Sequence, residues 1–160
     1  MASKLTHVDD TGRPRMVDVT GKNVTVRTAR ARATVHLGKA ILRQLTDDGF
    51  MTKKGPVFHT AMVAGVMAAK KTAELIPFCH PLPLNDCQVN IEVKGERVVI
   101  VTDVKTEAKT GVEMEALTAA SVAALTVYDM CKALGHAMVI EEVCLLEKRG
   151  GKSDFSRKRG

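Results

Sequence analysis

The first of four candidate segments for chemistry is Lys53-Lys54-Gly55-Pro56, just ahead of a predicted helix. The free backbone N–H groups and positive dipole of a helix N-terminus favour a phosphate there. Pro56 removes one of those donors. A solvated loop with two surface lysines accounts for this tetrapeptide better, so phosphate binding needs support from elsewhere in the sequence.

The second segment holds Cys79 and His80 in a loop with three prolines, Pro77, Pro81 and Pro83. Proline fixes a backbone dihedral, so this loop is expected to be rigid. Adjacent side chains of an extended loop diverge, which argues against a nucleophile–base pair between Cys79 and His80. His80 either donates a hydrogen bond to a polar ligand or serves the structure, and the segment leaves both open.

The third segment is a long predicted helix with Asp129 and Lys132 near its C-terminal end, three residues apart and therefore on one face. One interpretation is an ordinary surface ion pair, worth a few tenths of a kcal/mol. The other is a carboxylate and an ammonium that share a proton-transfer task. At the opposite end, Glu113, Met114 and Glu115 could hold a ligand, although Glu113 also fits a capping box that begins at Thr110.

The fourth segment places Lys148, Arg149 and Lys152 around a Gly-Gly pair. A Walker A motif would need glycine at position 146, which is Leu146, so we exclude a P-loop. Cations and backbone N–H groups of this kind can surround a polyphosphate, and a disordered basic tail is the alternative.

The formal net charge of +6 favours an anionic partner. With no Trp, one Tyr and four Phe, few aromatic side chains are available to stack nucleic-acid bases. The longest apolar run, about Ala61–Ala69, is too short to span a bilayer, and the N-terminus has no apolar signal region. The four cysteines form no CxxC pair and the histidines are scattered, so we expect reduced thiols, a cytoplasmic protein and no intrinsic metal site.

Periodicity predicts seven elements in the order β-α-α-β-β-α-β. They are a strand at Asn23–Leu37, a short helix at Lys39–Asp48, a long helix at about Pro56–Leu75, strands at Asp86–Lys94 and Arg97–Lys105 joined by a turn at Gly95, a second long helix at about Val112–Leu134, and a strand at Met138–Leu146. Without the short helix this is the ferredoxin-like order. We therefore predict an α+β fold in which two long helices cover one face of an antiparallel sheet.

The chain length of 160 residues suits one domain spanning 1–160. Its ends, about 1–14 and about 152–160, are polar or basic without apolar periodicity, so both are expected to be loose.

Four stretches of this sequence resemble the MoaC family, the cyclic pyranopterin monophosphate synthases of molybdenum cofactor biosynthesis. They are LTHVDDTGRPRMVDVTGK at 5–22, AAKKTAELIPFCHPLPL at 68–84, TGVEMEALTAASVAALTVYDMCKA at 110–133 and LLEKRGGKS at 145–153. The resemblance implies a lyase that converts 3′,8-cyclo-7,8-dihydro-GTP into cyclic pyranopterin monophosphate and releases pyrophosphate. It also implies a ferredoxin-like fold and a homo-hexamer, a trimer of dimers, with the pocket at a subunit interface.

By this resemblance the catalytic positions fall on Asp129, Lys132 and Lys54. The substrate-binding positions fall on Phe78, Cys79, His80, Glu113, Met114, Glu115, Lys22, Arg27, Lys148 and Lys152. Because the family's pocket is shared, we expect Lys54 to meet the Asp129/Lys132 pair of a different chain. Any Mg²⁺ is expected to arrive with the substrate triphosphate, held by its oxygens.

The alternative function is a non-enzymatic phosphate- or RNA-binding module on the same scaffold. Such a module stacks bases on aromatic side chains of its central strands. The strands predicted at Asp86–Lys94 and Arg97–Lys105 contain no Phe, Tyr or Trp, which argues against this alternative. We expect neither a nucleic acid nor a membrane as partner.

Overall fold

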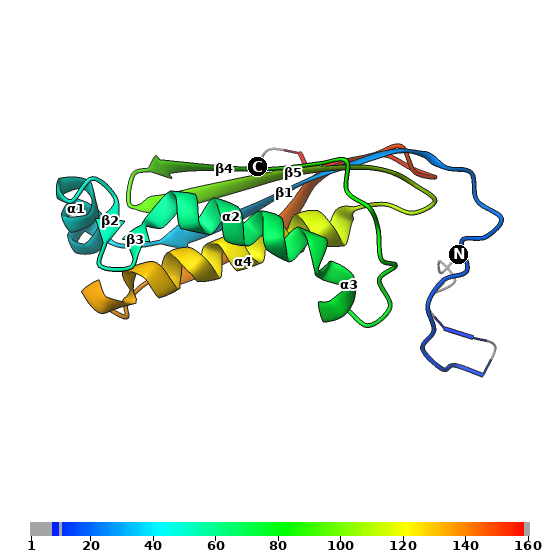
Figure 1. Ribbon diagram of the computed structural model, residues 1–160, viewed down its shortest axis with the longest axis horizontal. Helices are drawn as coiled ribbons and strands as arrows, with labels where there is room; N and C mark the ends of the chain where they lie inside the picture. The colour runs from blue at the N-terminus through cyan, green and yellow to red at the C-terminus, as the bar shows by residue number, and fades with distance from the viewer. Residues whose placement is uncertain (1–7, 10, 159–160) are drawn as a thin grey trace.

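A five-stranded antiparallel sheet carries two long helices on one face (Figure 1). The computed structural model describes residues 8–9 and 11–158. The sheet order is β4-β5-β1-β6-β7. Its strands are β1 at Thr25–His36, β4 at Asp86–Lys94, β5 at Arg97–Ala108, β6 at Val139–Arg149 and β7 at Phe155–Ser156.

The helical layer holds α2 at Val57–Lys70 and α4 at Glu113–Cys131. The smaller elements are α1 at Lys39–Asp47, α3 at Thr72–Leu75, a 3₁₀ turn at Lys132–Leu134, and the two-residue strands β2 at Met51–Thr52 and β3 at Gly55–Pro56. The α+β, ferredoxin-like prediction is therefore confirmed, because β1, β4, β5 and β6 pair in that fold's order with α2 and α4 as the two crossing helices.

Strand β1 shows why the sheet has one buried face. Ala31, Ala33 and Val35 are fully buried beneath the helices, as the period-two pattern predicts. On the other face Arg30 Nε lies 2.6 Å from Asp103 Oδ1 of β5, and Arg32 contacts Glu142 of β6. Cross-strand ion pairs thus line the face that the helices leave open.

Small side chains let α2 and α4 approach closely. A Cβ added at Gly65 of α2 would lie 3.1 Å from the backbone oxygen of Ala119 in α4. Ala116 and Ala123 of α4 are fully buried. The stretch Glu113–Leu134 has the length and apolarity of a membrane-crossing helix, and here it packs against both α2 and the sheet.

Two predictions about helices are wrong. The helix expected over Pro56–Leu75 breaks at Lys71, whose φ of −106° leaves the helical region, and α3 follows as a separate turn. The capping box expected at the start of α4 is not formed: Val112 is the N-cap residue and no side chain caps it. The Glu113 carboxylate instead forms an ion pair with Lys148, whose Nζ lies 3.4 Å from Glu113 Oε1.

The chain ends differ in part from the expected loose segments. Residues 155–156 form β7, in which Phe155 pairs with Lys148 of β6. At the other end, Val8 and Pro14 form an isolated antiparallel bridge. Positions 1–7, 10 and 159–160, also within the predicted loose ends, lie outside the described residues.

Candidate functional site

Asp129 binds two lysines at the C-terminal end of α4. Its Oδ2 accepts a hydrogen bond from Lys54 Nζ at 2.7 Å, and its Oδ1 lies 2.8 Å from Lys132 Nζ. Lys54 Nζ also donates to the Asp129 carbonyl at 3.1 Å. The hydrogen bond from Lys132, and then that from Lys54, lower the pKa of Asp129 to about 2. The three side chains, here called the lysine–aspartate cluster, remain about half exposed at 49–51% and open to a substrate.

The expectation that Lys54 meets Asp129 of another chain is wrong, because both residues of this contact belong to one chain. The reason lies in the helix directions. The N-terminus of α2, where the β2–β3 hairpin carries Lys54, lies at the same end of the molecule as the C-terminus of α4 (Figure 1).

Phe50 fixes the hairpin that carries Lys54. It is the one described residue other than glycine with a positive φ, 58°. Its ring stacks on Phe58 of α2 with centroids 4.7 Å apart, and its N–H donates to Leu45 O at 2.7 Å. No local sequence signal indicated this residue, because a left-handed phenylalanine has no compositional signature.

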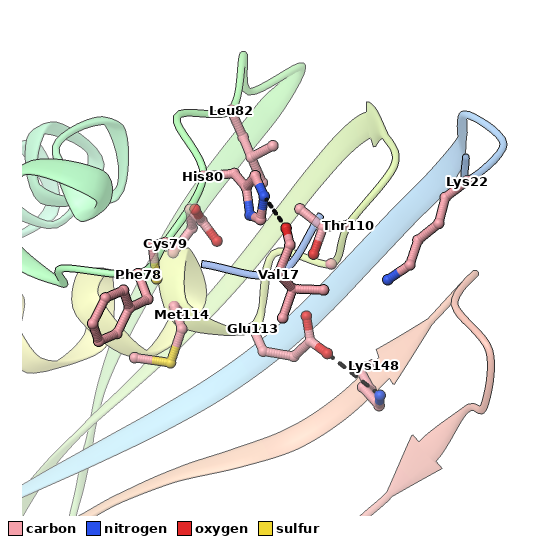
Figure 2. Close-up of a pocket in the computed structure, with 12 residues that line it drawn as sticks. Val17, Lys22, Phe78, Cys79, His80, Leu82, Thr110, Glu113, Met114 and Lys148 are labelled. Carbon is pink, nitrogen blue, oxygen red and sulfur yellow. Dashed lines mark hydrogen bonds and ion pairs between the residues drawn. The ribbon is translucent and has the colours of Figure 1, made fainter. Parts of the chain in front are cut away.

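The other end of α4 opens into a cavity of about 460 Å³, here called the ring pocket (Figure 2). Eight of the ten predicted binding residues line it: Phe78, Cys79, His80, Glu113, Met114, Glu115, Lys22 and Lys148. They come from the proline-rich loop, the first turn of α4, the N-terminal segment and β6. The sequence segments thus converge because the loop before β4 and the start of α4 share one end of the layer.

Glu115 is the buried acid of the ring pocket, with 4% of its surface exposed. Burial raises its pKa to about 7, and the charge of Glu113 adds to the effect. Glu115 is therefore able to gain or lose a proton near neutral pH. Cys79 beside it has a pKa raised by burial, so its thiol stays protonated and is not an activated nucleophile.

His80 contacts the backbone of the N-terminal segment. Its Nε2 lies 2.8 Å from Val17 O (Figure 2). Because a carbonyl oxygen only accepts, Nε2 carries the proton and donates. Of the two roles left open for His80, a structural hydrogen bond is therefore the one present here.

A second cavity of about 150 Å³, the basic pocket, adjoins the ring pocket, and Lys22, Glu113 and Lys148 line both. The remaining predicted residues, Arg27 and Lys152, line the basic pocket. Arg27 Nε is buried and has no hydrogen-bond partner among the described residues. The pocket's surplus of cations and this unsatisfied donor suit an anion.

Sequence reasoning missed Lys109 as a lining residue of the basic pocket, and it placed Arg149 in a basic segment without naming it as a binding residue. Lys109 follows the last residue of β5, and only the convergence of β5 with β6 and the N-terminal segment brings it here.

One chain does not bring the lysine–aspartate cluster and the ring pocket together. Glu113 and Asp129 are separated by the length of α4, about 24 Å at 1.5 Å per residue. In Figure 1 the N-terminus of α4 lies toward the end of the molecule that carries α3, and its C-terminus lies toward the end that carries α1. Within 8–9 and 11–158, no group of three or more His, Cys, Asp or Glu side chains is arranged to hold a metal ion.

Comparison with known proteins finds a match to the MoaC family over residues 16–151. A protein of Xanthomonas campestris pv. campestris (strain B100) named "Cyclic pyranopterin monophosphate synthase" is 54% identical over 159 residues, which are 99% of this chain and 96% of that protein. Proteins of the same name from Xanthomonas oryzae pv. oryzae (strain MAFF 311018) and Xanthomonas axonopodis pv. citri (strain 306) are 54% and 53% identical over 155 residues. In both cases the match covers 96% of this chain and 94% of the relative.

Proposed function

Because this chain belongs to the MoaC family, we propose that it is a cyclic pyranopterin monophosphate synthase, a lyase of molybdenum cofactor biosynthesis. It converts 3′,8-cyclo-7,8-dihydro-GTP into cyclic pyranopterin monophosphate and pyrophosphate. The observation that carries this proposal is the 54% identity to curated synthases over 99% of the chain. The geometry of the chain agrees with this proposal. A nucleotide-derived triphosphate needs a pocket for its rings, cations for its phosphates and groups for acid–base chemistry, and the chain offers all three.

The adjoining pockets divide the substrate between them. The fused rings lie in the ring pocket against Phe78 and Met114, within reach of Glu115. The triphosphate extends into the basic pocket, where Arg27 and Lys152 meet its charge. When the cyclic phosphate closes, a substrate hydroxyl oxygen bonds to the α-phosphorus and the bond to the β-phosphate oxygen breaks. The cations stabilise the pyrophosphate that leaves.

Proton transfers fall to the lysine–aspartate cluster. Asp129 is ionised and holds the two ammonium groups at fixed positions, 2.7 and 2.8 Å from its oxygens. Lys54 and Lys132 are then placed as proton donors during ring rearrangement, and Asp129 maintains their orientation. Any Mg²⁺ would arrive with the triphosphate, where substrate oxygens rather than a protein cage would bind it.

A second copy of the chain completes the site. Since about 24 Å separate the cluster from the ring pocket along α4, a single substrate molecule cannot contact both within one chain. A symmetric interface would place the cluster of one chain against the ring pocket of another. As the resemblance to the family implies, we propose a homo-hexamer, a trimer of dimers, as the assembly. Within the described residues all four cysteines are free, which suits the reducing cytoplasm.

The direct test is incubation of the purified protein with 3′,8-cyclo-7,8-dihydro-GTP, with pyrophosphate release and the pterin product measured together. Formation of both products supports the proposal, and absence of both from folded protein contradicts it. RNA binding is the alternative function. It is disfavoured because β1, β4 and β5 contain no Phe, Tyr or Trp. Binding of single-stranded RNA without turnover would favour it.

The shared site is tested by mixing inactive variants. Asp129→Ala removes the cluster of its own chain, and Glu113→Ala alters the ring pocket of its own chain. When the two proteins are unfolded and refolded together, roughly a quarter of the pockets receive two intact halves, so activity should return to about that level.

A mixture of Lys54→Ala and Asp129→Ala is the matched control. Both changes affect one cluster in one chain, so no pocket becomes intact and the mixture should stay inactive. Mass spectrometry must show mixed oligomers in both experiments. Recovery in the control, or none in the Asp129→Ala and Glu113→Ala mixture, would contradict the shared site.

A further inference from the structure

The segment Val17–Lys22, here called the strap, crosses the edge of the ring pocket before β1 begins. Val17 lines the ring pocket, and Lys22 lines both the ring pocket and the basic pocket. Figure 2 shows the Lys22 side chain extending from the end of the strap back toward the pocket. The strap therefore carries a cation that lines both pockets.

Two side chains from different parts of the fold hold the strap. His80 of the proline-rich loop donates to Val17 O at 2.8 Å. Lys109, just beyond β5, donates from Nζ to Thr20 O at 2.7 Å. Both acceptors are backbone carbonyls, so the anchors hold the path of the strap rather than any of its side chains.

The strap is also folded internally. Asp18 Oδ1 accepts from the Thr20 N–H at 2.8 Å, and the Lys22 N–H donates to Val19 O at 3.0 Å. Val17 and Val19 are half-buried while Asp18 and Thr20 are exposed, so alternate residues face the body of the protein. A segment with two anchors, an internal turn and a buried side is docked in a defined conformation.

Lys109 connects the strap with the basic pocket. Its ammonium holds the strap at 2.7 Å, its carbonyl accepts a hydrogen bond from Arg27 Nη2 at 3.4 Å, and it lines the basic pocket. We propose that Lys109 is the positioning residue of the strap. It holds the strap along the edge of the ring pocket and so fixes Lys22 where the two pockets meet. The consequence for substrate binding rests on the proposed function, whereas the docking of the strap does not.

The test measures the strap and the catalysis separately in the full-length protein. In Lys109→Met, amide hydrogen exchange of a peptide covering the strap should rise about tenfold, and trypsin should cleave faster after Lys22. KM for the cyclised dihydro-GTP should rise several-fold with little change in kcat. Lys109→Arg, which can still donate to Thr20 O, should restore both properties.

Lys105→Met is the matched control, because Lys105 is an exposed cation of β5 that does not line the ring or basic pocket. His80→Gln, which alters the other anchor, should also increase exchange in the strap. Unchanged hydrogen exchange of the strap in Lys109→Met would overturn the proposal. If KM rises while this exchange stays normal, Lys109 acts directly on the phosphates, which also overturns the proposal. If the wild-type protein shows no turnover, the proposed function fails while the exchange measurement still tests the strap.

Discussion

Asp129 and Glu115 are two carboxylates of α4 in opposite environments. Hydrogen bonds from Lys132 and Lys54 lower the pKa of Asp129 to about 2, and burial raises the pKa of Glu115 to about 7. Carboxylates whose pKa values are driven apart take different roles in acid–base chemistry. Asp129 is therefore ionised at neutral pH and holds the two lysines by charge, whereas Glu115 is able to gain or lose a proton there.

Asp129→Asn should lower kcat by about 10²–10⁴-fold, because the amide cannot hold two ammonium groups by charge. Asp129 is about half exposed, so thermal stability should change little. Steady-state kinetics and thermal unfolding on the same preparation check this, with Lys53→Met as the neighbouring control. Lost folding with normal activity per folded molecule would remove Asp129 from the catalytic group.

Glu115→Gln should stabilise the protein above neutral pH. The pKa of Glu115 is raised on folding from 4.5 to about 7, so the folded state binds more protons between those values and stability falls as pH rises through them. At pH 8 the variant should exceed wild type by on the order of 3 kcal/mol, and at pH 4 the two should agree closely. Denaturant unfolding at both pH values measures this, and an equal difference at both would contradict a buried, titrating Glu115.

At the scale of elements, the close approach of α2 and α4 determines the geometry of the site. Lys54 lies in the hairpin just before α2, Asp129 lies in the last turn of α4, and Lys132 directly follows that helix. Their separation is fixed where Gly65 faces Ala119. Changes at this crossing or in the hairpin should therefore affect a site that they do not touch.

Gly65→Val should destabilise the fold by about 1–3 kcal/mol, because its side chain would overlap Ala119 O, Val89 and Ala123. Val63→Ala, at a position of the same helix with 59% exposure, should stay within about 0.5 kcal/mol of wild type. Denaturant unfolding compares the two variants. Equal stability would show that the helices can separate at this point without cost.

Phe50→Ala should loosen the hairpin that positions Lys54. With the Phe58 stacking lost, Lys54 would contact Asp129 less often, and the pKa of Asp129 should rise from about 2 toward its ordinary value. The rise should not exceed that in Lys54→Met, where the hydrogen bond is absent altogether. Carboxyl ¹³C NMR titration measures both variants, and an unchanged pKa in Phe50→Ala would show that the hairpin holds Lys54 without the aromatic pair.

At the scale of the whole molecule, the two halves of the site occupy opposite ends of one helical layer. The ring pocket lies by the N-terminus of α4 and the lysine–aspartate cluster by its C-terminus, about 24 Å apart. The open face of the sheet also carries ion pairs such as Arg30–Asp103, which suit contact with water or with another polar surface. A single chain therefore does not bring these two groups of side chains together.

Activity per chain should fall on dilution in parallel with the mass of the assembly. With the proposed shared site, a monomer keeps its basic pocket and should still bind pyrophosphate, but its ring pocket lacks the cluster of a second chain. Light scattering and kinetics over one dilution series test this, with pyrophosphate binding measured by calorimetry. Full activity in a sample shown to be monomeric would contradict the shared site.

The amino-acid sequence by itself indicated the four long strands, the two long helices and the family. The alternation of Ala31, Ala33 and Val35 with Arg30 and Arg32 predicted β1, because strand periodicity is a local property. The long motif at 110–133 indicated the family, and the match over residues 16–151 confirms it. The predicted site residues came from the resemblance to that family, and the ten predicted binding residues line the two adjoining pockets.

Only the tertiary structure decided which of these residues meet. Lys54 and Asp129 are 75 positions apart, and their contact within one chain depends on how α2 packs against α4. The same holds for the pairing of Glu113 with Lys148, the pKa of Glu115, and the hold of Lys109 on Thr20. Local periodicity encodes which face of an element is buried, whereas contacts between distant residues and the desolvation of a charge arise only when the elements pack together.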